Sequence, residues 1–304
     1  MKKVVTLFLV LALVLSLAAC GAAPNETSTP KANISITDSR GKTVSFETQP
    51  QKIISLAPAN TEILYALGAG DRVIAVSEYC NYPEDTQGKQ KLPTGENLNM
   101  ESVLALKPDA VFMGKMSVMN EQIQQMEDAG IKVVVTEANS IDETYKSIRL
   151  MGKAVGKEKE AEQIVENMEK GFASIREQVK GKTAKTVYVE VSPLQFGLWS
   201  CGKNTFIQEL IEIVGAKNIF EDVEGWSAVS EEQVLARNPE IIFTTASPIT
   251  GIEDPVGEIV SRSQWNTLEA VKNNKVIMLD ADMISRPGPR LLDAAQEMVK
   301  AIYQ

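Results

Sequence analysis

Residues 101–112 read Glu-Ser-Val-Leu-Ala-Leu-Lys-Pro-Asp-Ala-Val-Phe, and residues 232–243 read Glu-Gln-Val-Leu-Ala-Arg-Asn-Pro-Glu-Ile-Ile-Phe. Both stretches begin with a glutamate and have Val-Leu-Ala, a proline and a phenylalanine at equivalent positions. The pattern is typical of a short helix that stops at a proline and leads into a buried strand. We therefore interpret the chain as a degenerate duplication, with one copy of this unit in each half.

Short apolar runs alternate with amphipathic stretches on both sides of the repeat. The predicted buried strands of the first half cover 53–57, 72–76, 110–113 and 132–136, and those of the second half cover 186–191, 240–244 and 275–279. Such alternation predicts parallel sheets with helices packed on them. We therefore expect an α/β protein of two similar lobes, each with a largely parallel sheet flanked by helices.

Apolar residues recur at steps of three and four between the two halves, within 156–180. This spacing predicts a helix about 35 Å long, which could join both lobes as a single connection. An ordinary surface helix inside one domain is the alternative. We expect an N-terminal lobe over 34–155, a linking helix over 156–181, a C-terminal lobe over 182–304, and a ligand cleft between the lobes.

The N-terminus has the features of an export signal. Lys2 and Lys3 precede an apolar run that ends at Cys20 and is too short to span a bilayer. We expect residues 1–20 to be a signal peptide with a lipobox, Cys20 to be acylated, and residues 21–33 to form a flexible tether. An uncleaved membrane anchor is the alternative. The folded part is then expected outside the cytoplasm, anchored to the cell membrane by lipid.

Composition excludes several classes of protein. Without Lys2 and Lys3, 29 basic residues stand against 40 acidic ones, a net charge of −11 that disfavours nucleic acid as a partner. The chain contains no histidine, which excludes His-dependent metal sites and Ser-His or Cys-His nucleophile pairs. Beyond Cys20, Cys80 and Cys201 lack metal-type spacing, and we interpret both as free thiols. We expect no catalytic residue, no metal site and no cofactor.

The glutamates that open the repeat, Glu101 and Glu232, place one carboxylate on each lobe. A carrier that a membrane partner grips on both lobes needs one contact on each, so we predict that these residues dock on that partner. A simpler role, in which each charge complements the positive end of a helix, fits the pattern equally well.

Candidate ligand contacts follow the predicted strands. Tyr79, Trp199 and Trp226 stand in loop contexts, which favours ring contacts with a large, partly apolar solute. The alternative is that each ring plugs a local core.

Polar candidates lie at two further turns. The backbone N–H groups where the first strand meets the next helix can bind an amide or an anion, and a loop near the C-terminus can form another wall. The residues at the first turn are Pro58, Ala59 and Asn60, and those on the loop are Asp282, Met283 and Arg286.

Several motifs resemble those of ABC-importer solute-binding proteins. They are the lipobox and residues 54–62, 79–83, 99–109, 226–234 and 286–290. The resemblance extends over nearly all of 53–303 and is closest to the group whose lobes are joined by one long helix. That group carries cobalamin, ferric siderophores or haem, and its cobalamin-binding members are the most similar. Two positions depart from them, because Gly95 stands in place of a tryptophan and Met283 in place of another aromatic residue.

The resemblance implies roles for particular residues. Glu101 and Glu232 would engage arginines on the two permease subunits of an importer. The residues implied to lie against a corrinoid are Ala59, Tyr79, Trp199, Trp226 and Asp282.

The implied function is that of a monomeric lipoprotein that binds a corrinoid and delivers it to an ABC importer with its ATPase, without catalysis. A ferric-siderophore or haem carrier is the alternative within the group. Of other classes, an extracellular sensor domain would need a signalling segment that the sequence lacks, and a hydrolase would need a Gly-x-Ser-x-Gly elbow and a histidine base.

Overall fold

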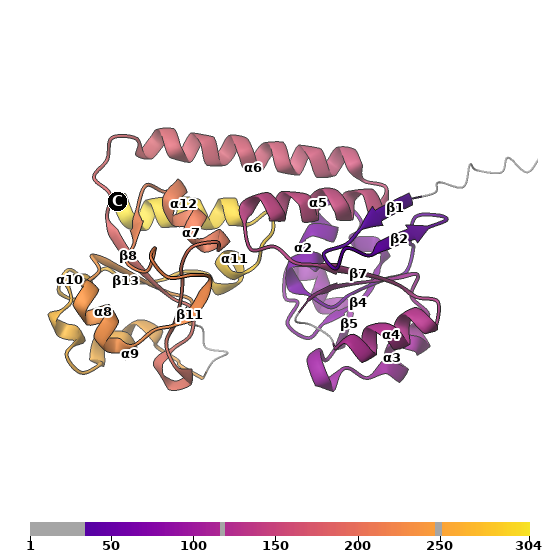
Figure 1. Cartoon of the computed structure of the whole chain (residues 1–304), viewed down its shortest axis with the longest axis horizontal. Helices are drawn as coiled ribbons and strands as arrows, with labels where there is room; N and C mark the ends of the chain where they lie inside the picture. The colour runs from indigo at the N-terminus through magenta and orange to yellow at the C-terminus, as the bar shows by residue number, and fades with distance from the viewer. Residues whose placement is uncertain (1–33, 116–118, 247–250) are drawn as a thin grey trace, which may run out of the picture.

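The alternating strands and helices fold into two α/β lobes that lie side by side beneath one long helix (Figure 1). The computed structural model describes residues 34–115, 119–246 and 251–304. The expected two-lobed architecture with largely parallel sheets is confirmed. The predicted signal peptide, Cys20 and the tether lie outside the described residues. None of the described helices combines the length and the apolar character that crossing a bilayer requires.

The N-terminal lobe is built on a five-stranded parallel sheet with the order β5-β4-β3-β6-β7. Its strands are β3 (Ile53–Ser55), β4 (Val73–Ser77), β5 (Gln90–Leu92), β6 (Ala110–Gly114) and β7 (Lys132–Thr136). Its helices are α2 (Pro58–Ala66), α3 (Met100–Leu106), α4 (Asn120–Asp128) and α5 (Ile141–Val155). Helices α2 and α5 cover one face of the sheet, and α3 and α4 cover the other (Figure 1). Strand β3 is therefore buried at every residue, as the unbroken apolar run predicts.

An antiparallel hairpin precedes this sheet, and the sequence reasoning did not predict it. It consists of β1 (Ile34–Thr37) and β2 (Thr43–Phe46), in which buried and exposed residues alternate. The buried carboxylate of Asp38 holds the turn, because its Oδ1 accepts hydrogen bonds from the backbone N–H groups of Arg40 at 2.9 Å and Lys42 at 3.2 Å. The hairpin packs on α5 and β7 and so closes the outer edge of the lobe.

The C-terminal lobe has a four-stranded parallel sheet with the order β10-β8-β12-β13. Its strands are β8 (Thr186–Glu190), β10 (Lys217–Asn218), β12 (Ile241–Thr244) and β13 (Val276–Met278). A separate antiparallel pair consists of β9 (Trp199–Cys201) and β11 (Trp226–Ala228). The helices are α7 (Phe206–Ile213), α8 (Glu231–Arg237), α9 (Pro255–Ser261), α10 (Glu269–Lys272), α11 (Ala281–Ser285) and α12 (Leu291–Tyr303).

The long helix α6 (Glu158–Val179) runs across both lobes on one side of the molecule (Figure 1). Its 22 residues extend about 33 Å at 1.5 Å per residue. One face of α6 is buried, and a single apolar core continues from α2 and α5 of the first lobe, beneath α6, to α7 and α12 of the second. Two smaller cores each remain within one lobe. The lobes are therefore joined by shared packing as well as by the chain.

The repeated sequence forms the same local structure twice. Helices α3 and α8 both have seven residues, and each starts at a side-chain cap, from Asn99 in α3 and from Ser230 in α8. Each ends in a residue with left-handed backbone, after which a proline leads toward a strand. Glu101 and Glu232 both stand second in their helices, within the first turn.

Candidate functional site

A cavity of about 360 Å³ lies between the lobes. The N-terminal lobe contributes the carboxyl ends of β3, β6 and β7, where loops of a parallel sheet commonly bind ligands. The C-terminal lobe contributes Phe206, Trp226, Ser285 and Pro287. A volume of this size is within the range of small-molecule sites, and both lobes contact whatever fills it.

The first turn of α2 lines the cavity with polar groups. The N-cap residue Ala57 has no side-chain acceptor and Pro58 has no N–H, so no side chain caps the N–H groups of Ala59 and Asn60. Asn60 is only 2% exposed. Its Oδ1 accepts a hydrogen bond from Thr136 Oγ1 at 2.7 Å, whereas its Nδ2 has no hydrogen-bond partner among the described residues.

Aromatic rings of the C-terminal lobe also line the cavity. Phe206 and Trp226 meet edge to face, with ring centroids 5.5 Å apart. The expectation that Trp199 and Trp226 lie in loops was wrong, because both belong to strands, where Ala228 pairs with Trp199. Cross-strand pairing fixes the backbone of both tryptophans, while the two residues remain 42% and 38% exposed. The backbone of Trp226 is thus held in place at the cavity.

Charge at the cavity is balanced. Of the described lining residues, only Lys115 and Glu137 are charged, and Lys115 Nζ lies 2.9 Å from Glu137 Oε2. The two internal gaps in the described chain, 116–118 and 247–250, contain no charged residue in the sequence. The cavity wall therefore offers no cation without a partner within its described part.

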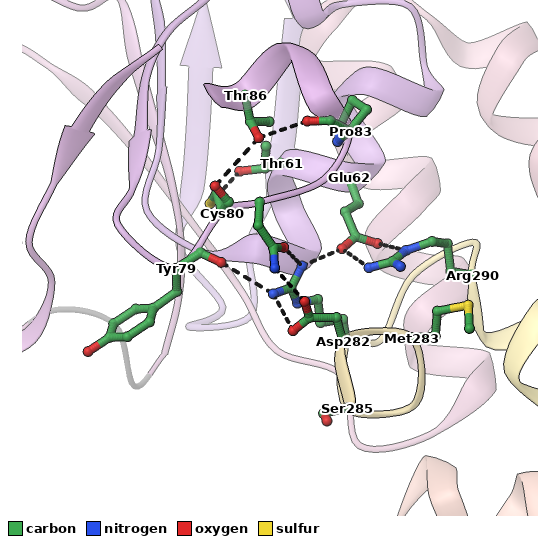
Figure 2. Close-up of polar contacts among 12 residues, drawn as sticks. Thr61, Glu62, Tyr79, Cys80, Pro83, Thr86, Asp282, Met283, Ser285 and Arg290 are labelled. Carbon is green, nitrogen blue, oxygen red and sulfur yellow. Dashed lines mark hydrogen bonds and ion pairs between the residues drawn. The ribbon is translucent and has the colours of Figure 1, made fainter. Parts of the chain in front are cut away.

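A network of charged and polar side chains joins the lobes next to the cavity, and Figure 2 shows it. We call Glu62, Asn81, Asp282, Arg286 and Arg290 the interlobe clasp. Glu62 Oε1 accepts from Arg286 Nη1 at 2.8 Å and from Arg290 Nη2 at 2.6 Å, and Glu62 Oε2 accepts from Arg290 Nε at 2.8 Å. Asn81 Nδ2 donates to Asp282 Oδ2 at 2.6 Å, and Asn81 Oδ1 accepts from Arg286 Nη1 at 2.8 Å.

Three side chains of the clasp are largely removed from solvent. The Glu62 side chain is 2% exposed, and those of Arg286 and Arg290 are 11% and 14% exposed. Burial acts to lower the pKa of Arg290, but the hydrogen bonds and charge of Glu62, together with the charges of Asp280 and Asp282, outweigh it and the net pKa is raised. Asp282 and Arg286, which the sequence predicts as ligand contacts, bind each other at 2.5 Å and also bond to Asn81 and Glu62 of the N-terminal lobe.

The structure brings together some of the predicted ligand residues and separates others. Those that line the cavity are Ala59, Asn60 and Trp226. Those outside its lining are Pro58, Tyr79, Trp199, Asp282, Met283 and Arg286. Met283 packs partly buried against the shared core, and Tyr79 is 61% exposed and offers its carbonyl to Arg286 at 3.2 Å.

Several lining residues escaped the sequence reasoning. They are Thr136, Glu137, Asn139, Phe206, Ser285 and Pro287. The signal for the first three was their position at or just after the end of β7, since loops at the carboxyl ends of parallel strands form such sites. Phe206 follows the capping residue Thr205 at the start of α7, a pattern that marks a helix and gives no indication of a cavity.

Both remaining cysteines are free and buried, one in each lobe. Burial raises the pKa of the Cys80 thiol and raises the pKa of Cys201 to about 12. Thiols of this kind are protonated at neutral pH and unreactive.

Glu101 and Glu232 are both exposed. Their helices α3 and α8 lie on the side of the lobes away from α6 (Figure 1). A hydrogen bond with the Ser230 side chain lowers the pKa of Glu232, which is therefore ionised at neutral pH. The two carboxylates thus mark one side of both lobes.

The sequence of this chain is similar to those of known binding proteins. The sequence profile described as periplasmic binding protein matches residues 53–283. An uncharacterized ABC transporter substrate-binding lipoprotein of Bacillus subtilis, YvrC, is 38% identical over 277 residues, which are 89% of this chain and 85% of the relative. A vitamin B12-binding protein of Pectobacterium carotovorum is 32% identical over 82% of this chain and 87% of the relative.

A solved structure is also similar. It is a possible iron-binding periplasmic solute-binding protein from Staphylococcus epidermidis, with a TM-score of 0.73 and 33% sequence identity. The alignment covers 84% of this chain and all of that one. The fold of this chain is therefore similar to that of a protein described as a possible solute-binding protein.

Proposed function

Since the chain belongs to the periplasmic binding protein family of ABC transporter substrate-binding proteins, we propose that its cleft holds a corrinoid and delivers it to an ATP-driven importer. The role is binding without catalysis, in keeping with the relatives, which are solute-binding proteins. We further propose that the mature protein is a monomer, lipid-anchored through Cys20 outside the cytoplasm. The relative YvrC is named a lipoprotein, which supports the anchor.

The balanced charge of the cavity carries the choice of a corrinoid. A ferric catecholate or the propionates of haem would bring negative charge, and burying an anion without a counter-charge is costly. Lys115 is paired with Glu137, and Arg286 is engaged in the clasp. The rings of Phe206 and Trp226 instead suit a large solute with neutral, partly apolar surfaces.

A ferric-siderophore or haem carrier is the second candidate. The similarity to a possible iron-binding protein at 33% identity favours it, although the vitamin B12-binding relatives are similar to nearly the same degree. The ligand is therefore best decided by direct titration.

Titration of the protein lacking residues 1–20 is expected to show binding of cyanocobalamin and cobinamide and little binding of haem or a ferric siderophore. Replacing Trp226 with alanine should weaken corrinoid binding roughly 30- to 150-fold, because losing about 100 Å² of ring contact at ~25 cal/mol/Å² costs about 2 to 3 kcal/mol. Isothermal titration calorimetry would measure both effects. Phe196→Ala is a matched control, since Phe196 is exposed and outside the cavity lining. Tight binding of the siderophore alone would reject the corrinoid.

Charge reversal at both docking glutamates, Glu101→Lys and Glu232→Lys, is expected to reduce importer-dependent uptake roughly tenfold or more, because like charges would face the permease arginines. Ligand affinity should stay unchanged, since neither residue lines the cavity. The control is Asp142→Lys, because Asp142 is also exposed and second in its helix but lies on α5, beside α6. Equal uptake defects in the control and the double variant would mean that the glutamates serve only their helices.

A further inference from the structure

One buried amide group at the cavity has no partner in the protein. Asn60 is 2% exposed, and Thr136 Oγ1 fixes its Oδ1 at 2.7 Å. Its Nδ2 is buried and makes no hydrogen bond to any described residue. Leaving a buried donor unpaired lowers the stability of a fold, so an unpaired amide on the wall of a cavity is a candidate for binding whatever fills that cavity.

The other lobe shows how the chain treats a buried asparagine away from the cavity. Asn218 is 1% exposed, and its Nδ2 donates to Cys201 O at 2.7 Å and to Gln208 Oε1 at 2.8 Å. Its Oδ1 accepts from the backbone N–H of Phe220 at 3.0 Å. Both ends of this amide are satisfied. Asn60 differs from Asn218 in that it lines the cavity.

Further donors belong to the same helical turn as Asn60. The backbone N–H groups of Ala59 and Asn60 belong to the first turn of α2, which has nine residues and no side-chain cap. This end of a helix carries partial positive charge and favours an oxygen acceptor. Among the described lining residues, the carboxylate of Glu137 is already paired with Lys115. The acceptor for these donors is therefore expected to come from the bound solute.

We propose that Asn60 Nδ2 donates a hydrogen bond to a carbonyl oxygen of the solute and thereby selects a ligand that presents a neutral carboxamide at this wall. The inference rests on the proposed function, because it specifies how the same cleft recognises its solute. A carboxamide oxygen is a strong acceptor without a net charge, so it satisfies the donor without the desolvation penalty of a carboxylate. Asn60 is then a specificity-determining residue.

Affinity for cyanocobalamin and cobinamide, measured by calorimetry, tests the contact. Asn60→Leu and Asn60→Ala both remove the donor and are expected to weaken binding about 10- to 100-fold, the range for a hydrogen bond lost in a buried site. Asn218→Ala, at the satisfied amide, should leave the affinity unchanged. Wild-type affinity in both Asn60 variants would overturn the proposal.

Thermal stability of the ligand-free protein gives a readout that does not depend on the solute. Asn60→Leu removes an unpaired donor, and Thr136 Oγ1 keeps the carbonyl of Met113 at 3.4 Å as an acceptor, so the melting temperature should stay level or rise. Asn218→Leu should lower it by several degrees. A fall at Asn60→Leu as large as that at Asn218→Leu would overturn the proposal, whereas failure of the wild type to bind either corrinoid would overturn only the proposed function.

Discussion

Replacing Glu62 with glutamine is expected to lower the free energy of unfolding by about 3 to 5 kcal/mol, the range for breaking a buried ion pair by removing one partner. The side chain keeps its shape but loses its charge. Arg290, 14% exposed, is then left facing a neutral amide, and Arg286 keeps only Asp282 as a carboxylate partner. Unfolding in guanidinium chloride, followed by circular dichroism, would measure the change.

The control is Glu162→Gln, which removes a carboxylate that Arg149 binds at the surface and should shift the midpoint little. A second variant separates the unpaired charge from lost packing. Glu62→Leu combined with Arg290→Leu removes both members of that ion pair and leaves Arg286 with Asp282, so it should recover part of the stability that Glu62→Leu alone loses. If Glu62→Gln unfolds at the same midpoint as Glu162→Gln, the clasp does not stabilise the lobes.

Arg262→Met is expected to lower the free energy of unfolding by a similar amount, about 3 to 5 kcal/mol at pH 7, because it leaves a buried carboxylate without its partner. Arg262 donates to Glu190 at 2.7 and 3.0 Å, and their side chains are 3% and 1% exposed. The guanidinium also stacks on Trp265, 4.4 Å from the ring centroid. Methionine retains part of this packing, so the lost charge pairing should dominate.

The pH dependence identifies the cause. Burial raises the pKa of Glu190, and Arg262 partly offsets it, so removing the arginine should raise that pKa further. A carboxyl group whose pKa is higher in the folded than in the unfolded state stabilises the fold when protonated and loses this contribution as pH rises through the folded pKa. The loss in free energy of unfolding of Arg262→Met relative to wild type should therefore be smaller at pH 5 than at pH 7. A deficit that is constant with pH would point to packing instead, and Arg149→Met is the surface control.

Much of the fold follows from local patterns. The unbroken apolar runs predict the central strands because strands covered on both faces need no polar alternation. The repeat predicts α3 and α8 because a proline after seven helical residues ends each helix in the same way. The periodicity of 156–180 predicts α6 because its apolar stripe must be buried.

The site was less predictable because it depends on contacts between distant segments. Glu62 and Arg290 are 228 residues apart, and each alone looks like an ordinary helix charge. The pairing of β9 with β11 joins short runs that have no strand signal of their own. Asn60 was predicted as a candidate from its place at a helix start, but the unpaired state of its amide depends on the position of Thr136 in three dimensions.

The core that continues beneath α6 also limits how this architecture can diversify. A lobe taken from one relative would have to match the apolar surface of the other lobe as well as its own interior. Whole-lobe exchange between homologues is therefore a poor route to a new cargo. Substitutions are tolerated most easily at the rim of the cavity, where they alter contacts with the ligand without disturbing the core that joins the lobes. Descendants of one ancestor can thus keep the same fold while carrying chemically different nutrients.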